Sequence, residues 1–293
     1  MNLKDYNWFK IEAICKYFEK VNNITKLINL IDIVNNEKLE LFILGDGSNI
    51  LLNEAMNNFM VIKPDFKEIK NIYIDNIQYI SVGAGVLLDD FVKYCINLNF
   101  LNMEYFSGIP GTIGGCTFMN VHYKNFFLSD FFTMITVFDI KEKKIKNFKK
   151  EELNYTYMNN IIKESNNFII LTVVFKLIKN IDQNNNQFKR REEFLLYRSS
   201  RYPSSNTCGC FFYNIKHLNG KEKSMGYQIE KLNILENYDF KNVRIHDTHN
   251  NMFVTNNNCT STEILELADF IKKKIKNNLN FIPKIECRLI GFD

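Results

Sequence analysis

Apolar residues recur with helical spacing in some segments of the chain and form short continuous runs in others. Helical spacing predicts helices over residues 23–31, 87–98 and 263–275. Short apolar runs rich in β-branched and aromatic residues predict strands at 39–44, 60–62, 72–74, 79–82, 134–140 and 168–177. This mixture of strands and helices predicts an α+β or α/β protein.

A glycine-rich stretch interrupts this pattern at residues 107–120, which read Ser-Gly-Ile-Pro-Gly-Thr-Ile-Gly-Gly-Cys-Thr-Phe-Met-Asn. It holds four of the 12 glycines of the chain, together with Pro110. Glycine permits positive φ and lets a ligand approach bare backbone, and a concave set of backbone N–H groups typically binds anionic oxygens. A tight connection between two core elements explains the same composition equally well, because turns are where glycines normally occur.

A second glycine-containing turn lies upstream, at Leu44-Gly45-Asp46-Gly47-Ser48-Asn49-Ile50-Leu51. The flanking apolar residues predict a strand, a polar turn and another strand. The turn lacks the following helix and third glycine of a dinucleotide fingerprint, and it lacks the Gly-Lys-Ser/Thr ending of a P-loop. Two such turns in one domain favour a ligand that carries phosphates at one end.

The glycine motifs occur in an order and spacing that resemble a known family. They are residues 45–51, Val82-Gly83-Ala84-Gly85 and residues 108–115, followed by Met119-Asn120. This ordered set is similar to the UDP-N-acetylenolpyruvoylglucosamine reductases, which are FAD enzymes of peptidoglycan synthesis. The resemblance covers nearly the whole chain, and the chain is similar to the shorter subclass of the family because it lacks an inserted loop.

The resemblance implies an α+β fold in which an FAD-binding part of the vanillyl-alcohol-oxidase type, built of two α/β subdomains, precedes a C-terminal α+β substrate domain. The implied subdomains are residues 1–63, joined by a C-terminal strand at 284–293, and residues 64–200; the substrate domain is 201–283. By resemblance, the two glycine turns bind FAD through Gly45, Asp46, Gly47, Ser48, Asn49, Ile50, Gly108, Ile109, Pro110, Gly111, Thr112, Gly114 and Gly115.

Two candidate catalytic residues follow from the same resemblance. Residues 206–214 resemble the active-site segment of the family, in which the residue after Gly209 donates a proton; the usual serine is Cys210 here. A thiol with a reference pKa of about 8.5 is mostly protonated at neutral pH, so Cys210 suits a proton donor. Residues 282–291 resemble the terminal Pro-x-x-Glu motif, which makes Glu286 the catalytic glutamate. Without the family, an inert buried cysteine and a solvated glutamate on an edge strand are the simpler interpretations.

The chain departs from the family at several positions. Met158 stands where the family has an arginine, and methionine offers no positive charge to a developing enolate, a loss worth about 3 kcal/mol. Either another cation replaces it, with Arg198 and Arg201 as candidates, or activity is impaired. The segment 198–203 resembles the basic substrate-contacting segment, so Arg198, Arg201 and Asn214 are the predicted substrate-binding residues. Tyr213 replaces a family lysine, and residues 8–13 lack the initial Gly-Gly pair.

Composition narrows the class of protein further. A net charge of +4 over 293 residues leaves no nucleic-acid footprint, and no apolar run is long enough to span a membrane. The 7 cysteines have no zinc-ligand spacing, so no metal is predicted, and a reduced cytoplasmic setting fits an unpaired set. We expect a cytoplasmic monomer whose partners are small molecules.

The resemblance implies that NADPH reduces the flavin and that UDP-N-acetylglucosamine enolpyruvate then receives the hydride, giving UDP-N-acetylmuramate. Two alternatives remain open. The first is another FAD oxidoreductase on the same scaffold, and rapid reaction of the cofactor with oxygen would favour it. The second is a non-catalytic flavin- or nucleotide-binding protein, which Met158 and the missing Gly-Gly pair favour.

Overall fold

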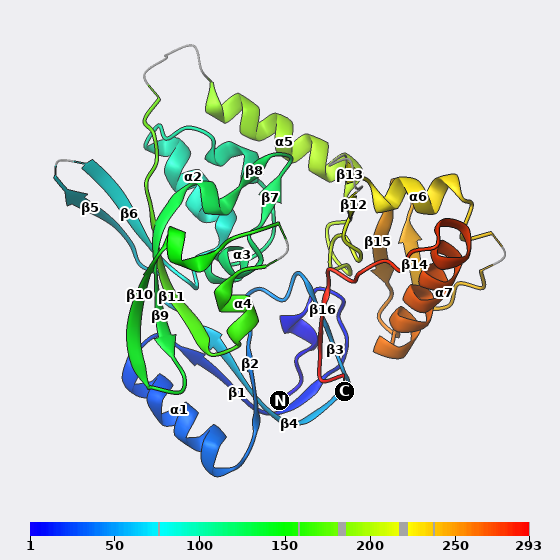
Figure 1. Ribbon diagram of the computed structural model, residues 1–293, viewed down its shortest axis with the longest axis horizontal. Helices are drawn as coiled ribbons and strands as arrows, with labels where there is room; N and C mark the ends of the chain where they lie inside the picture. Colours follow the sequence, from blue (N-terminus) through cyan, green and yellow to red (C-terminus); the bar gives the residue numbers. More distant parts are fainter. Residues whose placement is uncertain (76, 158, 181–185, 217–221, 237, 293) are drawn as a thin grey trace. The chain divides into compact units, whose positions relative to one another are not determined.

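A computed structural model describes residues 1–75, 77–157, 159–180, 186–216, 222–236 and 238–292 (Figure 1). The chain divides into two compact units. The first unit comprises Met1–Lys16, Gly47–Asn58 and Arg198–Asp293, and the second comprises Tyr17–Asp46 and Phe59–Tyr197. The chain therefore enters each unit more than once, and one of the points at which it passes from one unit to the other, between Asp46 and Gly47, falls in the first glycine turn.

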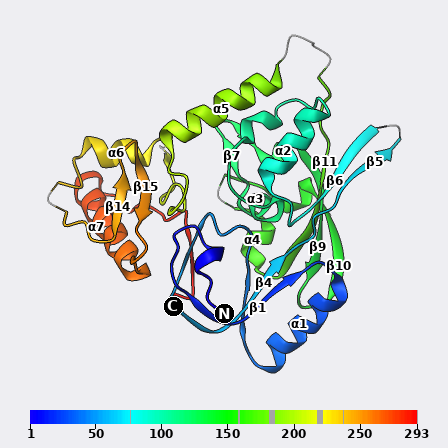
Figure 2. The same ribbon diagram turned by 180° about the vertical axis from the view of Figure 1, so that it is seen from behind.

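The second unit is built on a five-stranded sheet in the order β10-β9-β11-β6-β5, in which neighbouring strands are antiparallel. Its strands are β5 (Ile69–Ile74), β6 (Ile77–Gly83), β9 (Phe132–Asp139), β10 (Lys144–Lys149) and β11 (Phe168–Phe175). Figure 2 shows these strands running side by side behind α2 (Leu88–Asn97). The central strand β11 is apolar at nearly every position because both of its faces are buried.

Each face of β11 packs into a different core cluster. Ile170, Val173 and Phe175 join the cluster that includes the apolar face of α2. Ile169 and Leu171 join a second cluster with α1 (Ile24–Asn36) and with β2 (Glu40–Ile43) and β4 (Ala55–Pro64). A three-stranded sheet in the order β1-β4-β2 contains these two strands and β1 (Ile14–Val21), and β2 runs parallel to β4.

The first unit contains the hairpin of β14 (Val243–His246) and β15 (His249–Thr255), together with α6 (Met225–Lys231) and α7 (Ser261–Leu279). A capping box between Thr260 and Glu263 begins α7, and its buried apolar stripe faces the core. The Phe211 and Phe253 rings stack at 4.2 Å inside this core. Near the C-terminus, β16 (Arg288–Ile290) pairs in parallel with β3 (Ile50–Leu52). The three-domain division stays a prediction.

The remaining elements are short connections, except for one long helix. The short elements are the α-helices α3 (Ile113–Met119) and α4 (Ile161–Ser165), the strands β7 (His122–Tyr123), β8 (Phe126–Phe127), β12 (Ile215–Lys216) and β13 (Glu222–Lys223), and the 3-10 helices η1 (Lys4–Tyr6), η2 (Met103–Phe106), η3 (Leu128–Asp130) and η4 (Lys150–Leu153). The long helix is α5 (Gln187–Arg201), which Figure 1 shows at the upper edge of the view.

The predicted helices and strands are confirmed, but α5 was not predicted. Its only buried residue is Gln187, so it lacks the apolar stripe that marks a helix in a sequence. Ion pairs hold α5 in place instead. Arg191 donates two hydrogen bonds of 2.6 and 2.8 Å to the Asp89 carboxylate, and Arg190 Nε donates one of 2.9 Å to the buried Glu104 carboxylate. The segment that leads into α5 has buried residues, Asn180 before the helix and Gln187 at its start, and residues 181–185 lie outside the described part of the chain.

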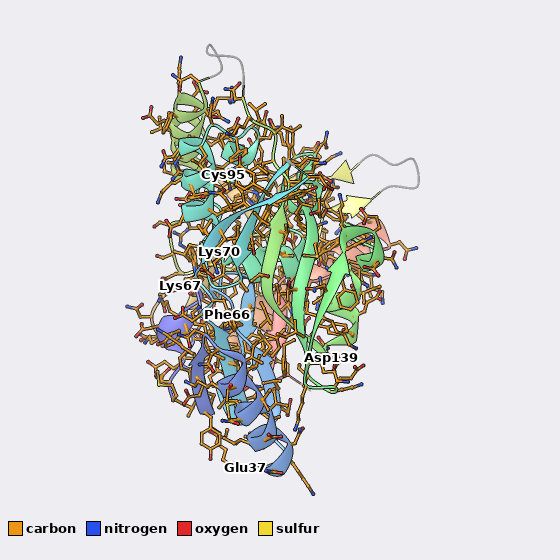
Figure 3. All side chains as sticks on the ribbon, turned by 90° about the vertical axis from the view of Figure 1, so that its left-hand side faces the viewer. Glu37, Phe66, Lys67, Lys70, Cys95 and Asp139 are labelled. Carbon is orange, nitrogen blue, oxygen red and sulfur yellow. The ribbon has the colours of Figure 1, made fainter. Side chains whose placement is uncertain are left out.

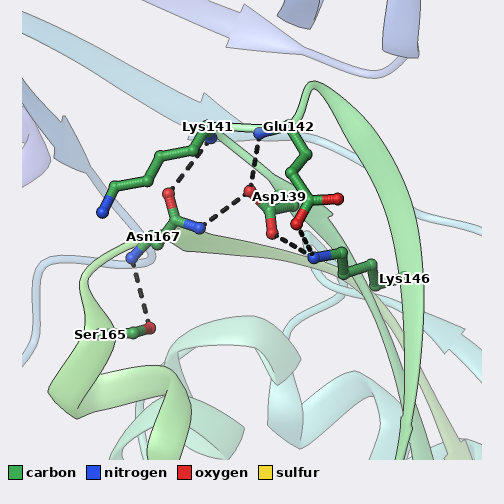
Figure 4. A network of polar contacts seen from close by, with 6 residues as sticks. All are labelled: Asp139, Lys141, Glu142, Lys146, Ser165 and Asn167. Carbon is green, nitrogen blue, oxygen red and sulfur yellow. Dashed lines mark hydrogen bonds and ion pairs between the residues drawn. The ribbon is translucent and has the colours of Figure 1, made fainter.

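A buried carboxylate closes the turn between β9 and β10 (Figures 3 and 4). Asp139 accepts hydrogen bonds from Lys146 Nζ at 2.7 Å, from Asn167 Nδ2 at 2.8 Å and from the Glu142 N–H at 3.0 Å. Burial alone would raise the pKa of Asp139, but these bonds outweigh it and lower the pKa from 3.8 to about 2. The ionised form is therefore the one that stabilises the turn.

We predict that Asp139→Ala lowers the free energy of unfolding by about 2–3 kcal/mol, because three donors lose a charged acceptor. Since the folded pKa is depressed, the contribution is present above the ordinary pKa of 3.8 and is lost as the pH falls towards 2. Urea unfolding midpoints at pH 7 and pH 3 measure both effects. The control is Asp32→Ala, which removes an exposed partner of Lys143 and changes stability by less than about 1 kcal/mol. Equal midpoints for the two variants at pH 7 would contradict the prediction.

Candidate active site

The two predicted glycine turns approach each other closely within the second unit. A Cβ built on Gly45 lies 3.1 Å from Thr112 Oγ1 and 3.5 Å from Gly115 Cα. In the second turn, a Cβ built on Gly114 would lie 2.9 Å from Ala84 Cβ. Each glycine therefore permits an approach of bare backbone that a side chain would block. The stretch 107–120 is a turn followed by the helix α3, which was not predicted because its glycines mask the helical pattern.

The backbone of these turns offers hydrogen-bond donors. Within the described part of the chain, no acceptor is found for the N–H groups of Gly45 and Gly111. Asp89 fixes the loop that contains Gly108, because its Oδ1 accepts a hydrogen bond from the Gly108 N–H at 2.9 Å. The same carboxylate forms an ion pair with Arg191. Free N–H groups on a braced loop fit the phosphate oxygens of a dinucleotide.

A lysine that belongs to no recognised motif lies beside the first turn. Lys63 lies near the end of β4 and donates through Nζ to the Gly45 carbonyl oxygen. Burial lowers the pKa of Lys63, and the nearby Asp46 carboxylate opposes that effect. A positive charge at this place suits an anionic ligand. In the sequence, the position of Lys63 between the apolar run 60–62 and Pro64 is the only feature that could have indicated this role.

The rest of the first turn belongs to the first unit and contacts the C-terminal segment. Gly47 has a φ of 71°, and a Cβ there would lie 2.1 Å from the Tyr6 carbonyl oxygen. The Asn49 carbonyl oxygen accepts from the Arg288 N–H at 3.1 Å, and Asn49 Nδ2 donates to the Glu286 carbonyl oxygen at 3.5 Å. Asn49 Oδ1 is buried and has no partner among the described residues, so it remains available to a ligand donor.

Adjacent glycines of the second turn allow a matched test of its role. We predict that Gly115→Ala folds normally, because the new methyl meets only ordinary contacts of 3.5 Å with Thr112 Oγ1 and 3.9 Å with Gly45 Cα. That methyl fills the space between the two turns, so FAD affinity falls by about tenfold or more, which is about 1.4 kcal/mol. Gly114→Ala instead collides with Ala84 at 2.9 Å and lowers the stability of the apoprotein. Flavin titration and urea unfolding of both variants distinguish the effects; parental FAD affinity in Gly115→Ala would contradict the assignment.

The two predicted catalytic residues lie together in the first unit. The segment that carries Cys210 pairs on one side with β15, where Cys210 is bridged to Met252. On its other side it pairs with the C-terminal segment, where the Glu286 N–H donates to the Phe211 carbonyl oxygen at 2.8 Å. Glu286 also acts electrostatically on the Cys210 thiol. The thiol and the carboxylate are therefore neighbours although 76 positions separate them in the sequence.

The surroundings of Cys210 keep its thiol protonated. Burial raises the pKa of Cys210, the negative charge of Glu286 raises it further, and a hydrogen bond from Asn251 lowers it by a smaller amount. Burial and the same glutamate raise the pKa of Tyr213 to about 12. A thiol that stays protonated above neutral pH is ready to give its proton to a developing carbanion, whereas it is a poor nucleophile.

Comparison with known proteins agrees with this geometry. The family described as UDP-N-acetylenolpyruvoylglucosamine reductase, C-terminal domain, matches residues 201–290, and the family described as FAD binding domain matches residues 16–143. These two matches contain the Cys210 segment and both glycine turns. The chain therefore contains an FAD-binding domain and a C-terminal domain of the UDP-N-acetylenolpyruvoylglucosamine reductase type.

Relatives that carry the name of this reductase match over nearly their whole length. The protein from Francisella tularensis is 29% identical over 284 residues, covering 96% of this chain and 95% of the relative. The protein from Prochlorococcus marinus is 29% identical over 301 residues, covering 100% and 96%. The crystal structure of the reductase from Thermus caldophilus superposes with a TM-score of 0.77 at 22% identity, covering 99% of this chain and 98% of that one. The predicted fold class and the predicted FAD cofactor are confirmed.

The predicted substrate-binding residues lie in the first unit. Arg198 and Arg201 are in the last turn of α5, where the Arg198 guanidinium lies 5.7 Å from the Tyr202 ring centre. The Arg201 carbonyl oxygen accepts from Thr248 Oγ1 at 2.7 Å. Asn214 Oδ1 accepts from the Met225 N–H at 3.1 Å, which ties it to the start of α6. Met158 lies outside the described residues, and all three substrate assignments stay predictions.

Two further observations concern metals and membranes. Among the described residues, no group of three or more His, Cys, Asp or Glu side chains is arranged to hold a metal ion. No helix within the described ranges combines the length and the apolar character needed to cross a lipid bilayer.

Proposed function

We propose that this protein reduces UDP-N-acetylglucosamine enolpyruvate to UDP-N-acetylmuramate with NADPH, in peptidoglycan precursor synthesis. The observation that supports the proposal is that the segment of Cys210 pairs with the segment of Glu286, where burial and the glutamate charge raise the pKa of the thiol, within the part of the chain matched by the C-terminal domain of this reductase family. An acid beside a carboxylate is what the reduction of an enolpyruvyl double bond requires, because one carbon of that bond receives a proton.

The residues present fit FAD. Within the second unit, Gly45 and the second glycine turn supply backbone donors for the diphosphate, and Lys63 supplies a positive charge. The chemistry supplied by bound FAD is hydride transfer, from NADPH and then to the methylene carbon of the enolpyruvyl group. The protein contributes binding, orientation and the proton.

In the proposed reaction, Cys210 Sγ gives its proton to the carbon next to the substrate carboxylate, and Glu286 acts on the enolic intermediate beside it. Arg198 and Arg201 bind the anionic substrate, and one of them supplies the positive charge that Met158 cannot. Asn214 contacts the substrate near the start of α6. We place the reaction in the cytoplasm and propose that the protein acts as a monomer.

The product identifies the reaction. We expect NADPH oxidation by the FAD-loaded protein to depend on UDP-N-acetylglucosamine enolpyruvate, and we expect mass spectrometry to find a product heavier than this substrate by two hydrogens. NADPH oxidation that proceeds at the same rate without the UDP-sugar, with oxygen consumed instead, would support another FAD oxidoreductase. Absence of any NADPH oxidation would support a non-catalytic binding protein.

A further inference from the structure

Asn251 on β15 is a buried amide that binds the Cys210 segment through three hydrogen bonds. Its Nδ2 donates to the Phe212 carbonyl oxygen at 2.7 Å, and its Oδ1 accepts from the Phe212 N–H at 3.0 Å. Its own carbonyl oxygen accepts from the Phe211 N–H at 2.8 Å. Only 1% of Asn251 is exposed, so these bonds are shielded from water. A side chain that satisfies both backbone groups of one residue fixes the orientation of that residue.

These bonds fix the position of Cys210. Gly209, directly before Cys210, has a φ of 77° and no atoms within 4 Å of a built Cβ. Before Cys210, the Gly209 N–H donates to Thr207 Oγ1 at 3.2 Å; after it, Asn251 holds the backbone, and Met252, next to Asn251, is bridged to Cys210 itself. The direction of the thiol follows from the Asn251 contacts.

The amide nitrogen has two hydrogens, and Phe212 uses only one. Asn251 lowers the pKa of the Cys210 thiol, opposite to the effect of burial and of Glu286. The other titratable groups near this thiol are Cys208 on its own segment and Cys287 beside Glu286, and all of them are neutral or negative. Among these groups, Asn251 alone carries an N–H donor.

We propose that Asn251 is a positioning residue for proton transfer: by fixing both backbone groups of Phe212 and the N–H of Phe211, it aims Cys210 Sγ at the carbon that receives the proton. In this step the S–H proton forms a new C–H bond with the carbon next to the substrate carboxylate, and the electron pair of the S–H bond stays on sulfur. The proposal rests on the proposed function for the identity of the proton acceptor.

The test replaces the donor while keeping the acceptor. Asn251→Asp retains an oxygen for the Phe212 N–H but brings a negative charge in place of the N–H donor. We expect the rate of Cys210 alkylation by iodoacetamide at pH 9, followed by mass spectrometry of the Cys210 peptide, to fall about tenfold, which corresponds to about one pKa unit. In the FAD-loaded protein, we expect reoxidation of the reduced flavin by the UDP-sugar to slow by tenfold or more while reduction by NADPH is unchanged.

Two controls separate this role from a structural one. Thr255 lies on β15 like Asn251, and its Oγ1 donates a buried hydrogen bond of 2.8 Å to the Phe9 carbonyl oxygen. Thr255→Val removes this bond, and we expect Cys210 to be alkylated at the parental rate. Asn251→Ser retains one donor and should lie between the parent and Asn251→Asp, which keeps the test available if the aspartate variant does not fold. Parental alkylation rates in both Asn251 variants would overturn the proposal. The alkylation needs no substrate, so its outcome stands even if the proposed function fails.

Discussion

Replacing Cys210 with alanine slows the reaction of the reduced flavin with the UDP-sugar by about 10²–10⁴-fold, while flavin reduction by NADPH keeps its parental rate. The size follows from the usual contribution of a positioned general acid. The selectivity follows from the position of the thiol, which stands beside Glu286 and is kept protonated there by burial and by the glutamate charge. Anaerobic stopped-flow absorbance measures the two half-reactions separately.

The matched control for this variant is Cys210→Ser, which restores a hydroxyl donor of similar size. We expect it to recover most of the lost rate, whereas Cys208→Ser changes a deeply buried thiol that contacts Cys287 and leaves the proton donor in place. A Cys210→Ala protein that completes both half-reactions at parental rates would show that the proton comes from another group.

Glu286→Gln slows the same half-reaction by about 10²-fold or more and, in addition, makes Cys210 more acidic. The second effect has a definite sign: the Glu286 charge raises the pKa of the Cys210 thiol, so its removal lowers that pKa and increases the thiolate fraction at a given pH. Alkylation of Cys210 at pH 9 should therefore be faster in Glu286→Gln than in the parent, opposite to the change expected for Asn251→Asp.

A glutamate in the same unit provides the control. Glu266→Gln removes an exposed carboxylate of α7 whose partner, Lys241, lies 3.9 Å away. We expect it to alter neither the half-reactions nor the alkylation rate. If Glu286→Gln alkylates at the parental rate, the carboxylate and the thiol are not electrostatic neighbours in solution.

The sequence predicted most elements of the fold because apolar periodicity marks them. The strands β9 and β11 and the helices α2 and α7 each carry a buried face that the pattern reveals. The helix α5 was not predicted because ion pairs to Asp89 and Glu104, and not an apolar stripe, hold it in place. Ion pairs between residues distant in sequence leave no periodic signal.

The residues of the candidate site likewise include some that the sequence predicted and some that it did not. The glycine turns could be recognised from the sequence, since glycine permits the close approaches of Gly45 to Thr112 and of Gly114 to Ala84. Cys210 and Glu286 were found by family resemblance alone. Asn251 and Lys63 were missed because their roles depend on contacts across 39 and 18 positions, and a lone asparagine or lysine carries no signal of its partner.

The central claim is that this chain reduces the enolpyruvyl ether of a UDP-sugar, and anaerobic flavin absorbance tests it most directly. NADPH added to the FAD-loaded protein should bleach the oxidised flavin band, and UDP-N-acetylglucosamine enolpyruvate should then restore it within the same cuvette. A band that bleaches with NADPH and stays bleached after the UDP-sugar would contradict the account, and would leave a flavoprotein of this fold with a different electron acceptor.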